Sequence, residues 1–172
     1  MELFEAIRKR RSIRQFTSQE VPDDYLNKIL EAAILAPSAG NLQSWHFIVV
    51  RSNSLKENLS KAAWNQEYVM NAPVVIVVCC DLEQIAPYGK RGSELFTLHD
   101  TGAAIENMLL ACTDIGLGSV WVGAFDEVKV AELLGLNWNK FRPVAIIPVG
   151  FSDEAPPVSS RRPLSEVVEY RL

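Results

Sequence analysis

The sequence predicts an α+β fold, and three observations lead to this assignment. Residues 74–80 are an almost wholly β-branched apolar run, and residues 94–115 have the apolar spacing of a long helix. A run of the first kind is typical of a central strand that is covered on both faces. The predicted helices and strands also alternate without a regular βαβ rhythm, which favours α+β over a parallel α/β architecture.

In the N-terminal half, residues 2–9 predict a short helix. Pro22 and two acidic residues then open a second helix that ends before Pro37, because proline suits the first helical turn and acids suit its dipole. Residues 46–51 predict a strand. Residues 54–63 predict a helix with Ser54 as its N-cap.

In the C-terminal half, we expect the strand at 74–80, a polar loop at 81–93 and the helix at 94–115, which Gly116 terminates. The later elements are a strand at 118–123, a helix capped by Asp126, a strand at 143–149 and a final stretch, 167–170, that could add a strand to a sheet edge. Asp100 lies within the apolar helix, so a buried salt bridge or a cap is expected there.

The composition bounds the domain organisation. With 172 residues, of which 48% are apolar and 22% charged, the chain is long enough for one domain with a sizeable core. We therefore expect a single domain over 1–172, with 152–172 as an extended C-terminal segment. The net charge of -4 argues against general affinity for nucleic acid or anionic membranes.

Cysteine usage and the N-terminus bear on location. Cys79, Cys80 and Cys112 lie inside apolar runs without metal-ligand spacing, so reduced packing thiols are expected and no metal. The first residues lack the order of a signal peptide, and no apolar run approaches the ~20 residues that span a bilayer. These features predict a cytoplasmic protein.

Two segments carry the functional signal. The first is the arginine segment, residues 10–16, in a stretch that has no acidic residue between Glu5 and Glu20. The second is the amide segment, residues 36–45, which is small and polar and ends in an indole. Alone, the arginines would usually be a solvated face, and the amides could merely stabilise a turn. Together they predict a planar, anionic ligand, because guanidinium groups bind phosphate through paired hydrogen bonds.

With Gly116–Gly123, Pro148–Phe151 and Arg161–Leu164 following in order, these motifs resemble the FMN-dependent nitroreductase family over essentially the whole chain. The resemblance implies a central, mostly antiparallel sheet flanked by helices. It also implies a homodimer with two FMN molecules at the subunit interface, and a C-terminal segment exchanged between the subunits.

The resemblance implies the cofactor-binding residues as well. They are Arg10, Arg11, Ser12 and Arg14 from one subunit; Pro37, Ser38, Ala39, Asn41 and Gln43 from the other; Asn65 at the pyrimidine edge; Trp121, Val122, Gly123 and Ala124 along the isoalloxazine; and Arg161 and Arg162 at the phosphate, with no choice made between these two. Trp45 is expected to be structural, whereas Trp121 is left open between packing and stacking. One departure is Ser44 in place of the family's usual proline, which we expect to loosen the loop.

The activity that the resemblance implies is an oxidoreductase that transfers a hydride from NAD(P)H through FMN N5 to a small acceptor such as a nitroaromatic or quinone, by ping-pong turnover. The flavin carries the chemistry, so no catalytic side chain is assigned. Arg14 near the N1–C2=O edge would stabilise the reduced flavin. Alternatives are a flavin store or redox sensor without turnover, a relative that fragments flavin or removes halogen reductively, and a module that binds no flavin. The acceptor and the choice between NADH and NADPH stay open.

Overall fold

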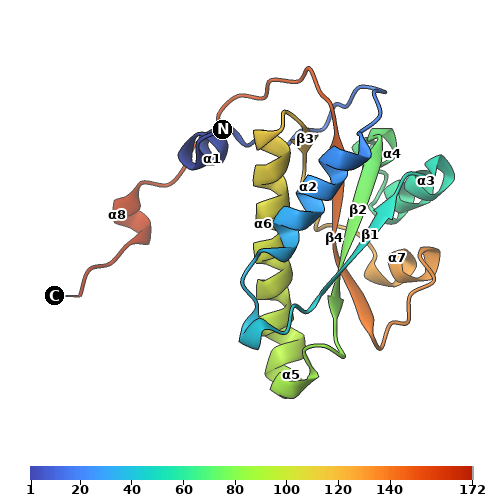
Figure 1. Cartoon of the computed structure of the whole chain (residues 1–172), viewed down its shortest axis with the longest axis vertical. Coiled ribbons are helices and arrows are strands. Elements are labelled where there is room, and N and C mark those ends of the chain that lie inside the picture. The colour runs from blue at the N-terminus through green and yellow to red at the C-terminus, as the bar shows by residue number, and fades with distance from the viewer. Residues whose placement is uncertain (172) are drawn as a thin grey trace.

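The computed structural model describes residues 1–171, and its centre is a four-stranded sheet in the order β1–β2–β4–β3 (Figure 1). All three strand pairs are antiparallel. The strands are β1 (Trp45–Val50), β2 (Val74–Asp81), β3 (Gly118–Ser119) and β4 (Phe141–Gly150). The predicted α+β class and the mostly antiparallel sheet are therefore confirmed.

Helices cover both faces of the sheet, and the side chains of β2 alternate between the two layers. Ile76 and Val78 pack against α2 (Asp23–Ile34) and α6 (Thr97–Asp114). Val75 and Val77 face α3 (Asn53–Ala62), α4 (Glu67–Asn71) and α7 (Glu127–Leu133). Because both faces are covered, the apolar residues of β2 are fully buried, as the β-branched run predicted.

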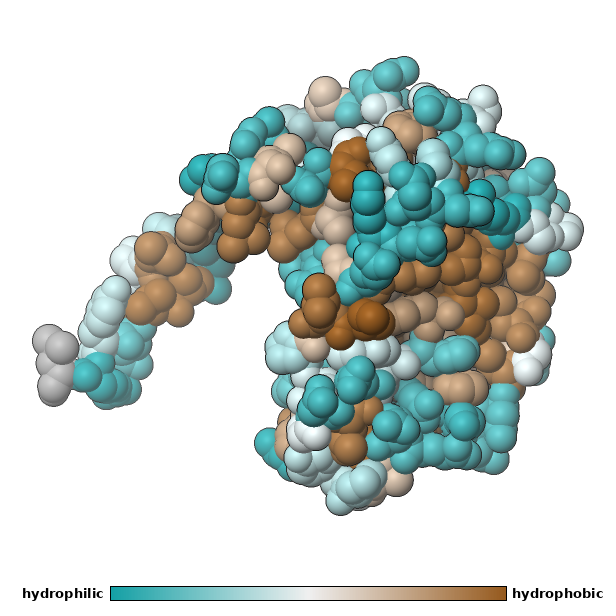
Figure 2. All heavy atoms as spheres, in the orientation of Figure 1, coloured by the Kyte–Doolittle hydropathy of each residue, from teal (hydrophilic) through white to brown (hydrophobic). Residues whose placement is uncertain are grey.

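The N-terminal helix packs against this body, whereas the C-terminal segment leaves it. The first helix, α1 (Leu3–Lys9), lies near the C-terminal end of α6, and after β4 the chain runs out as an arm that carries α8 (Leu164–Val167) (Figure 1). Figure 2 shows apolar side chains along this arm. The expected edge strand at 167–170 is wrong for this chain's own sheet. A helical turn bounded by Pro163 takes up part of it, and the rest has no strand partner among residues 1–171.

Residues 81–93 are not wholly a loop. They contain the turns η2 (Ala86–Tyr88) and α5 (Gly89–Arg91), and then η3 (Gly92–Phe96), a π-helical turn that runs into α6. Fully buried Ile85 anchors the segment, and a Cβ on Gly92 would stand 2.9 Å from the Ile85 carbonyl oxygen. The polar composition hid these tightly packed helical turns.

Three smaller expectations also need correction. The strand expected at 118–123 shrinks to β3 and one isolated bridge between Val122 and Ile146. The helix α4 was not predicted. The cap of α3 is Ser52, whose Oγ accepts from the Leu55 amide at 3.4 Å, and not Ser54. The Asp126 cap of α7 is confirmed by a 3.1 Å bond from the Lys129 amide. Within residues 1–171, no helix is long and apolar enough to cross a membrane.

Candidate functional site

The backbone of the arginine segment is fixed from two sides. Ser12 forms a parallel bridge with Ser119 at the edge of the sheet, and the Ile13 amide donates to the Ser119 carbonyl at 3.0 Å. From the other side, the Glu154 carboxylate accepts from the amides of Arg14 at 2.8 Å and Gln15 at 3.0 Å. The carboxylate therefore holds the segment through its backbone and leaves the arginine side chains free of it.

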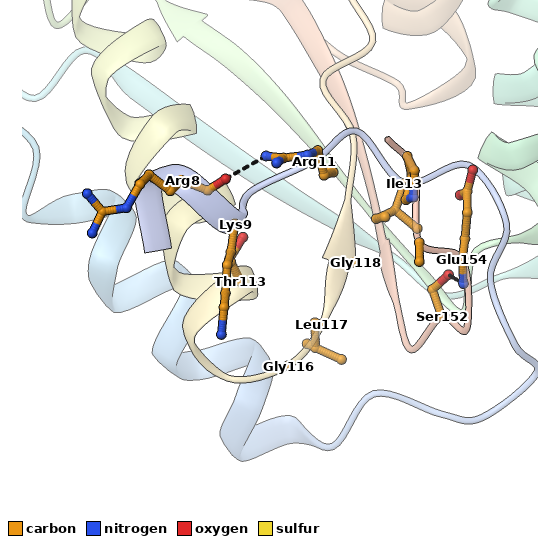
Figure 3. A pocket seen from close by; sticks show the side chains of 12 residues that line it. Arg8, Lys9, Arg11, Ile13, Thr113, Gly116, Leu117, Gly118, Ser152 and Glu154 are labelled. Carbon is orange, nitrogen blue, oxygen red and sulfur yellow. Dashed lines mark hydrogen bonds between the residues drawn. The ribbon is translucent and has the colours of Figure 1, made fainter. Parts of the chain in front are cut away.

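The arginine side chains point in different directions. Arg11 turns back on the end of α1, where its Nη1 donates to the carbonyls of Arg8 and Arg10, both at 2.7 Å (Figure 3). Arg10 lies 3.9 Å from the Glu106 carboxylate on α6. Arg11 also lines a basic hollow of about 370 Å³ together with Arg8, which sequence reasoning did not select. In this conformation, Arg10 and Arg11 are engaged within their own protomer.

Arg14 is directed toward two other predicted positions, through contacts that sequence reasoning missed. Its guanidinium carbon lies 5.7 Å from the centroid of the Tyr68 ring, and the Tyr68 hydroxyl donates to Gln66. The Gln66 amide nitrogen in turn donates to the Ala124 carbonyl at 2.8 Å. Asn65 sits next to Gln66 with a left-handed φ of 61°. Gln66 and Tyr68 therefore bring Arg14, Asn65 and Ala124 into one neighbourhood.

Unpaired backbone donors lie in this neighbourhood. The amides of Val120 and Val122 donate to β4, at 3.4 Å and 3.0 Å. In extended backbone, the intervening amides point the other way. Within residues 1–171, the Trp121 and Gly123 amides donate to no protein acceptor, and a Cβ on Gly123 would meet nothing within 4 Å. Two free backbone N–H donors, at Trp121 and Gly123, therefore lie next to open space.

The indole of Trp121 is partly accessible. It is 44% exposed and lies above Gly102 of α6, where an added Cβ would stand 3.7 Å from the ring. Trp45, the tryptophan that ends the amide segment, packs against the core on the α2–α6 side of the sheet, as expected of a structural residue.

The amide segment lies at the opposite end of α6. Its turn η1 (Ala39–Asn41) is tied to the first part of α6, because the Ala39 amide donates to Asp100 Oδ1 at 2.9 Å. Ser44 Oγ donates to Asp100 Oδ2 at 2.7 Å. Ser44 is fully buried and bonded to α6, and the expected loosening of the loop relative to proline stays a prediction. Asp100 is satisfied by these bonds and not by the expected salt bridge or cap.

The two motifs do not meet within one chain. The amide segment is attached at Asp100, whereas the arginine segment lies against Ser119, beyond the far end of α6 at Asp114. The helical rise between Asp100 and Asp114 is roughly 20 Å. Figure 1 shows the same separation, with η1 near α5 and the arginine segment near β3.

Arg161 and Arg162 are exposed and belong to the arm, just before α8. Arg161 Nη1 donates to the carbonyls of Ser159 and Ser160, at 3.2 Å and 3.0 Å. Arg162 pairs with the Glu166 carboxylate at 3.2 Å. Their guanidinium groups therefore bind within the arm itself in this conformation.

The chain resembles known proteins along most of its length. The model described as "Nitroreductase family" matches residues 7–67 and 62–151. A Methanothermobacter thermautotrophicus protein named "Putative NADH dehydrogenase/NAD(P)H nitroreductase" is 38% identical over 161 residues, which cover 91% of this chain and 80% of that protein. An NADH dehydrogenase of Thermus thermophilus is 34% identical over 191 residues, covering 95% of this chain and 93% of its own. The NADPH:FMN oxidoreductase of Vibrio harveyi, solved in complex with NAD+, matches 99% of this chain and 77% of its own with a TM-score of 0.91 and 30% identity.

Proposed function

This chain belongs to the nitroreductase family and is an oxidoreductase, and from that premise we propose that it uses FMN to pass a hydride from NAD(P)H to a small acceptor such as a nitroaromatic or a quinone. The observation that carries the proposal is the neighbourhood of Arg14, Asn65 and Ala124, which Tyr68 and Gln66 bring together. Because this group sits beside the free amides of the 121–123 stretch, one face of the protomer offers several kinds of donor to one ligand.

The donor set suits FMN. A guanidinium, a carboxamide at a left-handed turn and two unpaired backbone amides can serve the charged and the heterocyclic edges of a flavin, and the open space at Gly123 leaves room for a flat ring. Bound FMN would supply the atom that accepts and gives up the hydride.

The protein's own residues bind and orient. Arg14 adds a positive charge to this group of donors, which favours an anionic ligand there. With FMN bound, Asn65 would select one edge of the ring by hydrogen bonding, and the free Trp121 and Gly123 amides would donate to the ring. Trp121 is the residue placed to limit the access of water from the α6 side.

We further propose a homodimer in which the partner's amide segment completes each site. The separation of the two motifs along α6 supports this, because Pro37, Ser38, Ala39, Asn41 and Gln43 would otherwise have no part in the ligand contacts. Leu3, Phe4 and Leu35 are exposed, Leu35 to 80%, and exposed apolar surface of this kind favours a subunit contact. The projecting arm would carry Arg161 and Arg162 to the partner.

Anaerobic absorption spectroscopy tests the proposal directly. The purified protein, reconstituted with FMN, is expected to show flavin bands that bleach on addition of NADH or NADPH, and the bands should return when a quinone or nitroaromatic is added. Free FMN at the same concentration is the control for reaction in solution. Repeated cycles with an excess of acceptor show turnover, whereas bands that persist with both donors contradict the proposal. If the protein binds no FMN after reconstitution, FMN is excluded as its cofactor.

A further inference from the structure

A carboxylate is buried in α6 without a cationic partner. Asp100 is 4% exposed, and no lysine, arginine or histidine in the described part of the chain comes within ion-pair distance of it. Its two oxygens instead accept the Ala39 amide at 2.9 Å and the Ser44 hydroxyl at 2.7 Å. Burial of such a group is costly unless hydrogen bonds compensate for the lost water, so loss of either bond would destabilise the buried carboxylate.

The two bonds enclose a strained turn. Between Ala39 and Ser44, three residues have left-handed backbones, with φ of 56° at Gly40, 57° at Asn41 and 54° at Gln43. Glycine adopts this region freely, but asparagine and glutamine are held there at a cost. The Asp100 carboxylate therefore binds residues 39 and 44, on either side of the turn that carries the Asn41 and Gln43 side chains.

The hydrogen bonds within the amide segment do not attach its turn to α6. The Asn41 amide donates to the Ser38 carbonyl at 3.0 Å, and the Gln43 amide donates to Ser38 Oγ at 3.0 Å, but both bonds stay inside the segment. Thr97 adds a second link to α6, since its hydroxyl lies 3.3 Å from the Ser44 Oγ and 3.3 Å from the Ser44 carbonyl. The attachment to α6 thus runs through Asp100, with Thr97 as a weaker support at Ser44.

We propose that Asp100 is a positioning residue that holds the amide segment in its ligand-ready conformation before the flavin arrives, with Ser44 as its hydrogen-bonded partner. The proposal rests on the proposed flavin function. At the position where the resemblance leads one to expect the fixed ring of proline, Ser44 is held to α6 by its side-chain bond to Asp100, while its carbonyl accepts from the Asp81 amide at 3.0 Å. Asp100 itself need not touch the ligand.

The test compares Asp100→Ala, Asp100→Asn and Ser44→Ala with the parent protein. Thr101→Ala is the matched control, because Thr101 is also buried on α6 but its hydroxyl bonds neither Ala39 nor Ser44. It donates to the Thr97 carbonyl at 2.8 Å and lies 4.0 Å from Cys80 Sγ on β2. Two quantities are measured: amide hydrogen exchange of residues 39–45 without flavin, and the FMN dissociation constant by quenching of flavin fluorescence. Melting temperatures show the general loss of stability.

We expect Asp100→Ala to speed exchange at Leu42 and Trp45 at least tenfold and to raise the FMN dissociation constant about tenfold, since a turn that is competent only part of the time reduces apparent affinity by that fraction. Ser44→Ala should act in the same direction but less strongly. Asp100→Asn keeps an acceptor for the Ala39 amide and should recover most of the loss. Thr101→Ala should leave both quantities near the parent values.

Unchanged exchange in Asp100→Ala would overturn the proposal, and so would an equal loss of affinity in Thr101→Ala. The exchange measurement needs no flavin. If the parent protein binds no FMN, the proposed function is refuted, but the exchange data still test the positioning role of Asp100. If Asp100→Ala binds FMN as tightly as the parent, only the positioning role of Asp100 is refuted.

Discussion

The close approach of the arginine segment to β3 depends on Gly118, and its replacement by alanine is the most direct test of that contact. A Cβ at this position would stand 2.7 Å from Ile13 Cγ2, 2.9 Å from Ile13 Cβ and 3.0 Å from Ile13 Cγ1. Ordinary van der Waals contact begins near 3.4 Å, so the nearest atom of Ile13 would have to retreat by roughly 0.7 Å.

A change of rotamer cannot relieve this clash, because the Ile13 Cβ itself is too close. The backbone has to move, although it is fixed by the Ile13–Ser119 hydrogen bond of 3.0 Å and by Glu154. Overpacking of this kind costs about 1–3 kcal/mol. For a chain of this length, we expect Gly118→Ala to lower Tm by roughly 3–10 °C. FMN affinity should also fall, because Ser12 and Arg14 are displaced with Ile13.

Thermal unfolding and fluorescence titration with FMN measure the two effects. Gly102→Ala is the control, because its Cβ would lie at an ordinary 3.7 Å from Trp121 and alanine favours a helix interior by up to about 1 kcal/mol. Adding Ile13→Ala to Gly118→Ala removes two of the three close atoms, so it should cost less stability than in the parent. Strictly additive effects, or a Gly118→Ala variant with parental Tm and affinity, would refute the reasoning.

Four further outcomes are expected. Arg14→Ala should raise the FMN dissociation constant about 10–100-fold, as loss of a charged hydrogen bond does, and make the reduction potential of the bound flavin more negative. Fluorescence titration and spectroelectrochemistry measure the two effects, and the control Arg8→Ala should stay near the parent values. An unchanged potential would show that Arg14 does not stabilise the reduced flavin. Truncation after Ser160 should abolish both FMN retention and the dimer in size-exclusion chromatography with light scattering, whereas a yellow truncated dimer would contradict the role of the arm. Burial raises the pKa of the Cys79 and Cys112 thiols to about 12, so native protein at pH 8 should not react at these positions with a thiol reagent that labels them after unfolding. Because the unfolded thiols ionise near 9.0 while the folded ones stay protonated, the urea midpoint should fall as pH rises from about 9 towards 12; rapid native labelling at pH 8 would contradict the buried positions.

The elements that follow local pattern could be predicted from the sequence. The run at 74–80 is β-branched from Val74 to Val78 and apolar to its end, and it forms the central strand because such a run suits burial on both faces. The long helix was predicted from its apolar spacing, and its C-terminal turn from Gly116, whose φ is 79°. In each case the signal lies within a few turns of chain.

The contacts that assemble the candidate site have no such local signal. Gln66 and Tyr68 connect Arg14 with Ala124, and each of these two lies more than fifty positions from them in the sequence. Nothing in the Trp64–Tyr68 stretch indicates that role. The role of Ser44 could not be inferred either, because it depends on Asp100, which is 56 positions away in the chain. The direction of Arg11 was hidden for the same reason, since a carbonyl one helical turn earlier captures its guanidinium.

The length of α6 has a consequence for how the protein responds to dilution. If each site needs the amide segment of a second chain, then FMN and the partner subunit bind as linked equilibria, and each raises the apparent affinity for the other. Dilution alone would release the cofactor, and added FMN would drive monomers together. The specific activity of the protein would then rise with its own concentration, which makes the amount of protein in a cell a control on its rate.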